Sequence, residues 1–446
     1  MGRSKRIGRH LIMRAGYGEK VITPPPGIEL TGYGYYRERK AEAVLDDLKA
    51  RALFISQGRE SIILICCDLL GITIDYADTV RAEISSRFEV LPQNILLACT
   101  HTHTGPAVQT LLGLGEADAN YPFQLSTAIV EAVEQAWQDM GEAAPHYHTE
   151  IVEPIGFNRR NKSFTPIDPA LRILLFKRGS GSIYLLSYAC HPVVLGPASA
   201  VSADWPGALI SSLENRGYRG IFFQGFCGNI DPVSNFNRWG TGTKRDLDLY
   251  GKMLSDRALK AEQHAVALPQ INIKALETRQ ALPLSVPSRA KIAKEKEAWL
   301  EANSGKDGCR RFIESWAECA EKNYDRLKEK PCLTDVPLQA LAIGPLKIIA
   351  FPGEVFCDYG LRLQEKYPSI FTIGYANGYI GYLPTADAYH NSSDYACYSA
   401  PKFAGIFPFA VDIENVLLKA SESLLISLDF FRYSANDQGV TCNGSG

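Results

Sequence analysis

The sequence predicts an α/β protein in which a strand–strand–helix–strand unit occurs three times. Each unit begins with two short apolar runs around a glycine-containing turn, which is typical of a hairpin. A helix-like stretch follows, and then a third apolar run that opens into a polar loop. We therefore expect mixed sheets built from three β-β-α-β units around one site, with the chemistry at the strand ends.

The three units keep the same order of hairpin, helix, strand and loop. In the first unit these parts are residues 51–67, 76–88, 94–99 and 100–106. In the second unit they are residues 171–190, 205–216, 220–224 and 225–232. In the third unit they are residues 338–353, 359–366, 371–376 and 377–382.

The same position in each unit carries an ionisable residue. Ten residues after the turn glycine stand Asp68, His191 and Glu354. Active sites of α/β folds gather where strands end and loops begin, because the sheet fixes the backbone there. We expect these three residues to face one site.

The segments between the units add helices. Residues 121–140 predict an amphipathic helix, residues 145–155 a strand, and residues 235–267 a loop followed by a helix. The highly charged stretch 288–330 has apolar residues at helical spacing, which predicts a helical insertion on the surface.

Length and composition bound the classes of function. Of the 446 residues, 46% are hydrophobic and 22% are charged, which is typical of a globular protein. The net charge of −2 lacks the excess of positive charge that is typical of a nucleic-acid-binding protein. We expect a flexible leader over 1–14, a single catalytic domain over 15–430 and a flexible tail over 431–446.

Several features bear on location and partners. The start lacks the apolar stretch of a secretion signal, and no apolar run is long enough for a stable membrane insertion. The 11 cysteines include no C-x-x-C pair and several lie in apolar runs, so we expect reduced thiols and a cytoplasmic protein. The expected partner is a small molecule.

The polar loop of the first unit contains His101 and His103, two residues apart. Alternate residues of an extended strand end point the same way, and imidazole suits zinc. A pair of hydrogen-bonded loop histidines is the competing interpretation. His191 and Glu354 at equivalent strand ends favour the metal, because two histidines and a carboxylate make a catalytic zinc set with an open position for water.

These motifs, in this order, resemble the neutral/alkaline non-lysosomal ceramidases. The motifs are THTHTGP at 100–106, ACHP at 189–192, QGFCGNIDP at 224–232, PGE at 352–354 and NGYIGYLPT at 377–385. Three further motifs also resemble that family, namely ITPPPG at 22–27, GYG at 32–34 and GFNRR at 156–160. The resemblance runs from about Ala15 to Phe409 and implies the catalytic domain of a zinc-dependent amide hydrolase.

The resemblance also implies roles for single residues. It implies a Zn²⁺ ion held by His101, His191, Glu354 and Tyr382. His103 matches a residue beside the zinc-bound water or the substrate oxyanion.

An active-site arginine is implied as well, at Arg159 or, as the competing assignment, Arg160. A further catalytic tyrosine follows the ligand tyrosine in the family, and Tyr395 is the nearest match here. We expect Arg159 and Tyr395 to stabilise the oxyanion, while Glu354 and His103 move the proton from water to the leaving amine.

Four residues outside this set have two interpretations each. Asp68 is expected to orient one histidine of the first loop through its other ring nitrogen, or else to cap the following turn. Asn229 and Asp231 line the pocket or build an Asx turn. Cys227 is an alternative nucleophile, although an apolar packing thiol is favoured.

The predicted function is hydrolysis of the C–N bond of a linear amide by metal-activated water. The alternatives are a zinc-dependent acyltransferase or cyclase, and a hydrolase of an ester or lactone of a soluble metabolite. A cysteine hydrolase that uses Cys227 and a non-catalytic binding protein are the least favoured alternatives. Because the sequence leaves no room for the accessory domain of ceramidases, a soluble amide or ester is expected at least as much as ceramide.

Overall fold

The computed structural model describes residues 12–269 and 272–430. The leader expected over 1–14 falls mostly outside these ranges, and its last two residues, Met13 and Arg14, lie in the first strand. The tail expected over 431–446 lies outside the described residues.

The larger sheet has the strand order β11-β9-β8-β6-β1-β3-β4-β5, and β13 pairs with β6. Its strands are β1 (Met13–Val21), β3 (Lys49–Gln57), β4 (Glu60–Cys67), β5 (Ile95–Cys99), β6 (Gly141–Ile151), β8 (Ala170–Arg178), β9 (Ile183–Tyr188), β11 (Arg219–Gln224) and β13 (Val266–Ala267). The second sheet has the order β14-β15-β16-β18. Its strands are β14 (Ile273–Pro283), β15 (Cys332–Ile343), β16 (Leu346–Ala350) and β18 (Phe371–Ile373).

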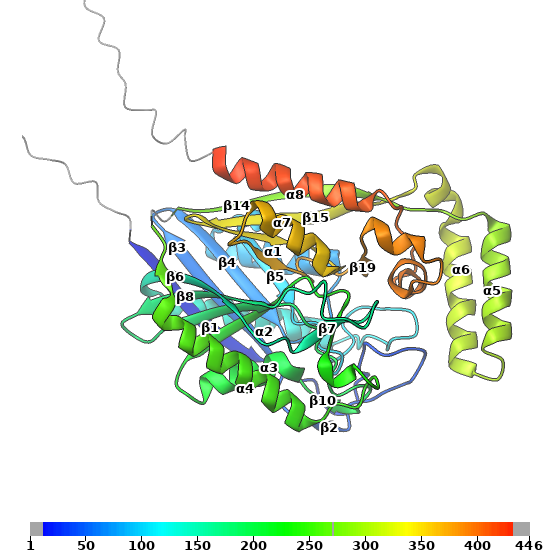
Figure 1. Ribbon diagram of the computed structural model, residues 1–446, viewed down its shortest axis with the longest axis horizontal. Helices are drawn as coiled ribbons and strands as arrows, with labels where there is room; N and C mark the ends of the chain where they lie inside the picture. Colours follow the sequence, from blue (N-terminus) through cyan, green and yellow to red (C-terminus); the bar gives the residue numbers. More distant parts are fainter. Residues whose placement is uncertain (1–11, 270–271, 431–446) are drawn as a thin grey trace, which may run out of the picture.

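The two sheets pack face to face, and helices cover their outer faces (Figure 1). Both faces of β4 are apolar, because successive side chains of a strand point to opposite faces of the sheet. Ile62 and Leu64 pack against the second sheet, while Ile63 and Ile65 pack under the helices. The helices on the larger sheet are α1 (Ile74–Phe88), α2 (Tyr121–Gln138), α3 (Asp204–Glu214) and α4 (Lys244–Ala261). Those on the second sheet are α7 (Cys357–Lys366) and α8 (Ile413–Phe430).

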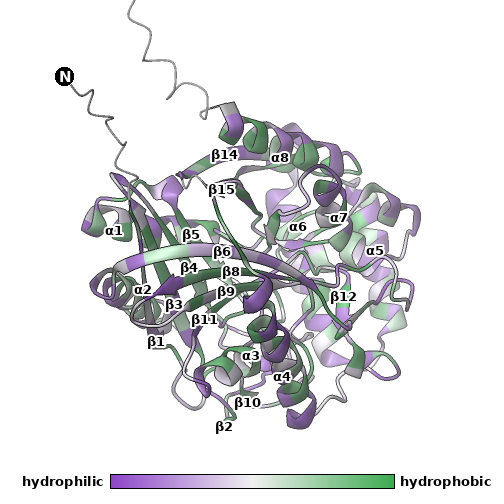
Figure 2. Cartoon of the chain, turned by 60° about the vertical axis from the view of Figure 1, so that its left-hand side comes forward, coloured by the Kyte–Doolittle hydropathy of each residue, from purple (hydrophilic) through white to green (hydrophobic). Residues whose placement is uncertain are grey.

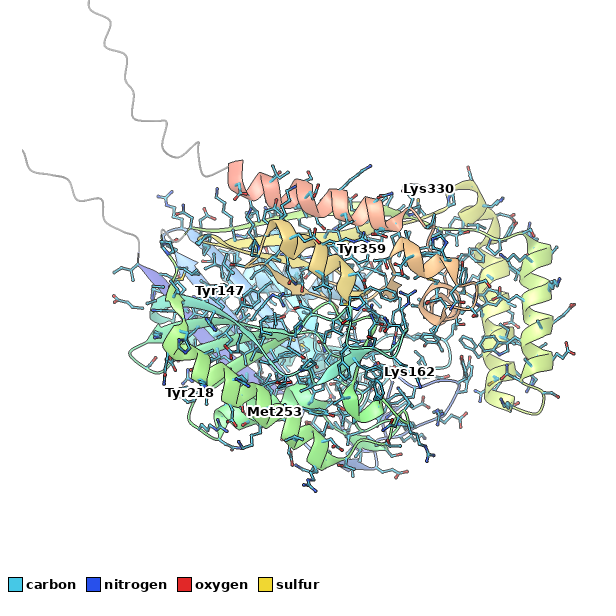
Figure 3. All side chains as sticks on the ribbon, in the orientation of Figure 1. Tyr147, Lys162, Tyr218, Met253, Lys330 and Tyr359 are labelled. Atoms are coloured by element: carbon cyan, nitrogen blue, oxygen red, sulfur yellow. The ribbon has the colours of Figure 1, made fainter. Side chains whose placement is uncertain are left out.

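Hydropathy follows these layers. Figure 2 shows strands that are mostly hydrophobic and helices such as α2 and α4 with hydrophilic outer faces. Tyr359 of α7, labelled in Figure 3, is fully buried, and its hydroxyl donates to the Pro384 carbonyl. Within the described ranges, no helix has the length and apolar character needed to cross a bilayer.

Three segments of the chain share one pairing pattern. In each, an antiparallel hairpin is followed by a helix and then by a strand parallel to the second hairpin strand. The segments are β3-β4-α1-β5, β8-β9-α3-β11 and β15-β16-α7-β18. Parallel neighbours need a crossover, which the helix supplies. The α/β class with mixed sheets that the sequence predicts is confirmed.

The helical insertion expected near 288–330 is also present. It consists of α5 (Arg289–Ala302) and α6 (Asp307–Glu329), which stand side by side at the right of Figure 1. The Ser288 side chain caps α5 by accepting from the Lys291 backbone N–H. α6 buries Phe312 and Trp316 against the body of the protein.

Short elements complete the fold near the strand ends. Outside the two sheets, the strands of two residues are β2 (Ala43–Val44), β10 (Ala200–Val201), β17 (Glu354–Val355) and β19 (Tyr382–Leu383), and those of three residues are β7 (Gly156–Asn158) and β12 (Ile230–Pro232). The short helical turns are η1 (Pro92–Asn94), η2 (Val233–Asn235), η3 (Glu262–His264), η4 (Ala386–His390), η5 (Tyr395–Ser399) and η6 (Ala400–Lys402).

Candidate metal centre

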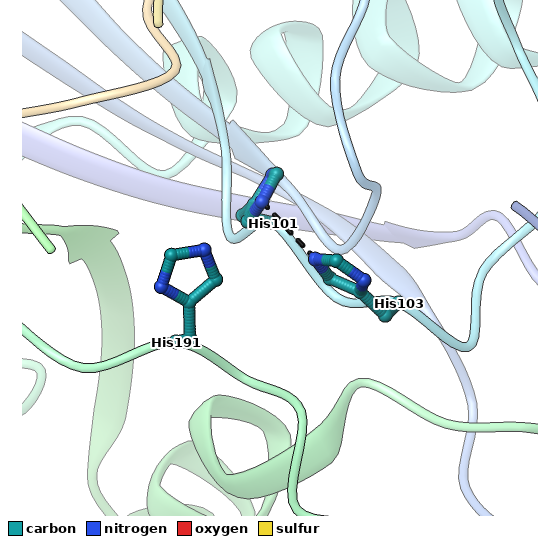
Figure 4. A group of neighbouring side chains, drawn as sticks. All are labelled: His101, His103 and His191. Carbon is teal, nitrogen blue, oxygen red and sulfur yellow. Dashed lines mark hydrogen bonds between the residues drawn. The ribbon is translucent and has the colours of Figure 1, made fainter. Parts of the chain in front are cut away.

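Three histidines meet in the interior at the ends of β5 and β9 (Figure 4). His101 and His103 lie in the loop after β5, and His191 lies in the loop after β9. One ring nitrogen from each lies within 4.8 Å of those of the other two, and the Nε2 atoms of His101 and His103 are 3.1 Å apart. His101 and His191 are fully buried, and His103 is partly buried.

Backbone carbonyls fix the direction of each ring. The Nδ1 atoms donate to the carbonyls of Leu70 for His101, Gly32 for His103 and Cys227 for His191, at 2.7, 2.8 and 2.8 Å. A ring nitrogen that faces a carbonyl carries the hydrogen, so each neutral imidazole presents Nε2 as an acceptor. In this neutral form, each of the three rings directs an Nε2 lone pair toward the centre.

The local backbone makes room for these rings. His101 has a φ of 69°, and its N–H donates to the Leu69 carbonyl at 2.8 Å, which holds the left-handed turn. Gly32 has a φ of 102°, and a Cβ there would lie 2.7 Å from the His103 ring. Only glycine fits this position beside His103.

Glu354 brings a carboxylate to the same centre from β17. Its Oε2 lies 2.9 Å from Nε2 of His191 and 3.4 Å from Nε2 of His101. Its Oε1 accepts from the Tyr379 hydroxyl at 2.5 Å. Burial raises the pKa of the Glu354 carboxyl, but the positive charge and hydrogen bonds that His101 and His191 offer when protonated lower it more, so it lies well below its usual range. The carboxylate is ionised.

This donor set fits a metal ion. The Nε2 atoms of His101 and His103 are 3.1 Å apart, and the Glu354 carboxylate lies 2.9 Å from His191 and 3.4 Å from His101, in a site that excludes most solvent. Acceptors this close repel unless a cation or a proton lies between them. Imidazole and carboxylate are the ligand types of catalytic zinc sites, so the residues present suit a divalent cation of that kind.

Tyr382 and Arg159 adjoin the carboxylate. β19 pairs in parallel with β17 so that Tyr382 stands opposite Glu354. Arg159 donates to the Tyr382 hydroxyl at 2.6 Å, to the Gly228 carbonyl at 2.9 Å and to Asp231 at 3.0 Å. The guanidinium is therefore fixed beside the tyrosine that the family resemblance implies as a ligand.

The neighbouring arginine points elsewhere. Arg160 pairs with Asp394 at 3.1 Å and with Asp387 at 3.2 Å. Of the two arginines left open by the sequence, Arg159 is the one that contacts Tyr382. Tyr395 begins η5, and its ring packs edge-on to the ring of Tyr382 with centroids 5.8 Å apart.

Two cavities open beside these side chains. One of about 30 Å³ is lined by His103, Glu354, Tyr379, Tyr382 and Tyr395 together with apolar residues. The other, of about 420 Å³, is lined by Arg159, Arg160, Asn229, Asp231 and Tyr395 among others. Tyr395 lines both cavities.

Asp68 does not take its expected role. Its carboxylate accepts from Arg51 at 2.8 Å and from the Lys49 backbone at 3.0 Å. The second ring nitrogens of His101 and His103 face carbonyls instead. The prediction that Asp68 orients a histidine is wrong, because a buried arginine on the adjacent strand β3 takes the carboxylate.

Asn229 and Cys227 are held by other contacts. The Asn229 side chain accepts from the Cys357 N–H at 2.8 Å and donates to Asp358 at 3.0 Å, which ties the loop to the start of α7. The Cys227 thiol is fully buried against the Tyr375 hydroxyl at 3.3 Å. Burial of this thiol favours the packing interpretation.

Two tyrosines near the centre were not singled out from the sequence. Tyr379 bonds Glu354, and Tyr375 stacks on His101 with ring centroids 4.0 Å apart. Both lie within or just before the NGYIGYLPT motif, so the density of tyrosines there was the available signal. Nothing in the spacing tells which of them reaches the carboxylate.

Comparison with known proteins places the fold. No family model matches the sequence, and no curated protein matches it by sequence. The structure is similar to the neutral ceramidase of Pseudomonas aeruginosa, with a TM-score of 0.71 and 18% identity, covering 94% of this chain and 74% of that one. It is also similar to a structure of a ceramidase complexed with C2, with a TM-score of 0.72 and 18% identity, covering 94% and 75%. The resemblance to neutral ceramidases is therefore confirmed at the level of the fold.

Proposed function

We propose that this chain is a zinc-dependent hydrolase of linear amides. The observation that carries the proposal is the buried centre in which three imidazole acceptors and the Glu354 carboxylate converge. The shared fold with neutral ceramidases supports an amide as the bond that is cut.

The proposed ligands come from the three hairpin units. His101 follows the first unit, His191 lies after the hairpin of the second, and Glu354 after the hairpin of the third. Tyr382 is proposed as the fourth, since β19 sets it beside Glu354. When bound, Zn²⁺ polarises the substrate carbonyl and acidifies water.

His103 is the proposed proton carrier. Its Nδ1–H is fixed on the Gly32 carbonyl, and its Nε2 borders the small cavity as an acceptor. The water oxygen bonds to the carbonyl carbon and its proton passes to Nε2. The C–N bond then breaks and the proton passes to the leaving nitrogen. The products are a carboxylic acid and an amine.

Arg159 and Tyr395 are the proposed oxyanion donors. Both border the open pocket, and Asp231 and the Gly228 carbonyl hold Arg159 in place. Fixed donors stabilise the developing negative charge without having to reorganise.

The cytoplasmic location predicted from the sequence stays a prediction.

Metal content and activity test the proposal together. We expect zinc to co-purify with the wild-type protein, and His101→Ala and Glu354→Gln to lose the metal and at least about a hundredfold in amide hydrolysis. His148→Ala, a histidine in β6 away from the centre, is the matched control and retains both.

Two results would contradict the proposal. The first is full activity in a His101→Ala protein that contains no zinc by elemental analysis. The second is loss of activity in Cys227→Ser while zinc stays bound, which favours the thiol route. Added amine that diverts product from the free acid would indicate acyl transfer instead.

A further inference from the structure

One short segment, residues 202–205, contacts both loops that carry the histidines. It runs from the end of β10 into the first turn of α3, near the bottom of Figure 1. Its four residues are each at most 1% exposed. Buried polar groups need hydrogen-bond partners within the protein, so the contacts of this segment show what it holds in place.

The first contact is with the loop of His101 and His103. The Thr102 and Thr104 hydroxyls donate to the Ser202 carbonyl at 2.7 and 2.9 Å. The Ser202 N–H donates to the Thr104 carbonyl at 3.1 Å. The threonines alternate with the histidines along this loop, so the threonines face the 202–205 segment while the histidines face the centre.

The second contact is with the loop of His191. The Asp204 carboxylate accepts from the backbone N–H groups of Val194 at 3.1 Å and Leu195 at 3.4 Å. It also accepts from the Trp205 N–H at 2.8 Å, and the Trp205 indole N–H donates to the His191 carbonyl at 3.3 Å. Each group that the carboxylate binds is a backbone donor, which suits an ionised acceptor.

The segment is itself fixed in a strained conformation. Asp204 has a φ of 55°, a region that is costly for a residue with a side chain. Asp46, in the loop between β2 and β3, accepts from the Ser202 hydroxyl at 2.6 Å and from the Ala203 N–H at 2.7 Å. The Ser202 hydroxyl in turn accepts from the Asp204 N–H at 3.0 Å. Such strain persists only where the surroundings impose it.

We infer that the 202–205 segment sets the two histidine loops relative to each other, with Asp204, Thr102 and Thr104 as its positioning residues. These side chains hold the loops from behind, so losing one leaves every imidazole on its own loop but changes the distance between the loops. Metal affinity depends on that distance, because ligand atoms must meet at one point. The metal-binding part of the inference rests on the proposed function, whereas the coupling of the two loops does not.

Asp204→Asn tests the contact with the His191 loop. An asparagine places an amide donor against backbone N–H groups, so we expect Zn²⁺ affinity to fall by about 10–100-fold at pH 8, measured by competition with a chromogenic chelator. Burial raises the pKa of Asp204 to about 7, so the wild-type carboxyl is ionised at this pH. With Co²⁺ in place of zinc, the visible absorption spectrum should change as well.

Asp168→Asn is the matched control for this variant. It removes a carboxylate that is 5% exposed and pairs with Arg172 at 2.8 Å, before β8. The folded protein should keep the wild-type Zn²⁺ affinity and Co²⁺ spectrum. If Asp204→Asn also kept both, or if both variants changed them equally, the inference would be overturned.

Thr102→Val and Thr104→Val test the other contact, and they decide the matter if Asp204→Asn does not fold. Valine keeps the shape of threonine but cannot donate to the Ser202 carbonyl, so we expect about tenfold weaker Zn²⁺ binding for each. Thr102→Ser restores the hydroxyl and should restore the affinity. Thr372→Val, the control, removes a buried hydroxyl that has no hydrogen-bond partner. Losses of the same size in all four variants contradict a positioning role.

A double variant tests whether the segment acts as one unit. Because Asp204 and Thr104 act through the same segment, the loss of Zn²⁺ affinity in the double variant should be smaller than the product of the two single losses. A loss equal to that product would mean two independent contacts, and it would overturn the coupling of the loops.

Hydrogen exchange in the metal-free full chain separates this inference from the proposed function. The His191 N–H donates to the Ile230 carbonyl at 2.9 Å, and mass spectrometry of a peptide over residues 189–195 follows its loop. We expect this peptide to exchange at least about threefold faster in Thr104→Val, a change on the other loop, and at the wild-type rate in Thr372→Val. Unchanged exchange in Thr104→Val overturns the inference. Faster exchange in a protein whose wild type binds no zinc supports the inference, and the proposed function alone then fails.

Discussion

Each of the three histidines is held by a neutral backbone carbonyl rather than by a carboxylate. A carbonyl fixes the tautomer and the direction of the ring without adding negative charge behind it. The negative charge is instead concentrated in Glu354, whose second oxygen is held by Tyr379. The affinity for the proposed metal would thus depend on how firmly one carboxylate is oriented.

Removing the Tyr379 hydroxyl tests this dependence. We expect Tyr379→Phe to weaken zinc affinity by about 10–100-fold, because Oε1 of Glu354 loses its donor and the carboxylate is free to rotate. Competition with a chromogenic chelator measures the affinity.

Tyr359→Phe is the matched control. It removes the buried hydroxyl of a tyrosine on α7 that donates to the Pro384 carbonyl, and it should leave zinc affinity unchanged. An equal loss of zinc in both variants would mean that Tyr379 acts only through general stability.

Sequence reasoning reached the residues of this centre unevenly. His191 and Glu354 were predictable because they stand at the same register of two hairpin units. The residue at the same register in the first unit is Asp68, which pairs with Arg51. The first unit instead contributes His101 to the centre, from the loop after its last strand, β5. Register locates a residue along a strand, but it does not tell which partner its side chain meets.

At the scale of elements, one carboxylate joins a helix to several strands. Asp139, at the end of α2, accepts from the Tyr17 N–H of β1 at 2.9 Å, from Arg178 of β8 at 2.8 Å and from Arg219 of β11 at 2.8 Å. Partial burial raises the pKa of Asp139, but these donors lower it more, so the net shift is downward. The ionised form is therefore bound more strongly in the folded state.

The pH dependence of this contact has a definite sign. A lowered pKa in the folded state adds stability above about pH 4, and that stability is lost as the pH falls through the folded value. We expect Asp139→Asn to lower the free energy of unfolding by about 1 kcal/mol at pH 7, a magnitude limited by partial exposure, and by less at pH 3. Urea unfolding at the two pH values measures both.

An exposed aspartate provides the comparison. Asp248 on α4 is 59% exposed in its side chain and pairs with Lys244 one turn away, so Asp248→Asn should change stability by less than about 0.5 kcal/mol. If the loss in free energy of unfolding caused by Asp139→Asn were larger at pH 3 than at pH 7, the downward shift assigned to the pKa of Asp139 would be contradicted.

Long and short elements differed in how well they could be predicted. The helices α5 and α6 follow from apolar residues at helical spacing. β17 and β19 have two residues each, which is too short for any periodic pattern, yet their pairing sets Tyr382 against Glu354. The site thus depends on elements that only tertiary contacts define.

For the whole molecule, a bound metal would act as a cross-link between distant parts. His101 and His191 follow strands of the larger sheet, whereas Glu354 follows β16 of the second sheet. A ligand that binds only the folded state stabilises it by about 4 kcal/mol at a thousandfold excess over its Kd.

Metal removal should therefore lower the melting temperature. For a chain of this length that free energy corresponds to about 5 °C, measurable by calorimetry with and without a chelator. His101→Ala should melt at the lower temperature and respond to neither zinc nor chelator. A wild-type Tm that is indifferent to both would argue against a metal that links the two sheets.

The split of the centre between the two sheets also has a consequence during translation. The ribosome delivers His101 and His191 long before Glu354 and Tyr382, which belong to the last hairpin unit and the segment after it. A nascent chain can complete the larger sheet while its two histidines still lack their carboxylate. Under the proposed function, competence to retain zinc would therefore arise late in synthesis, when the second sheet closes over the first.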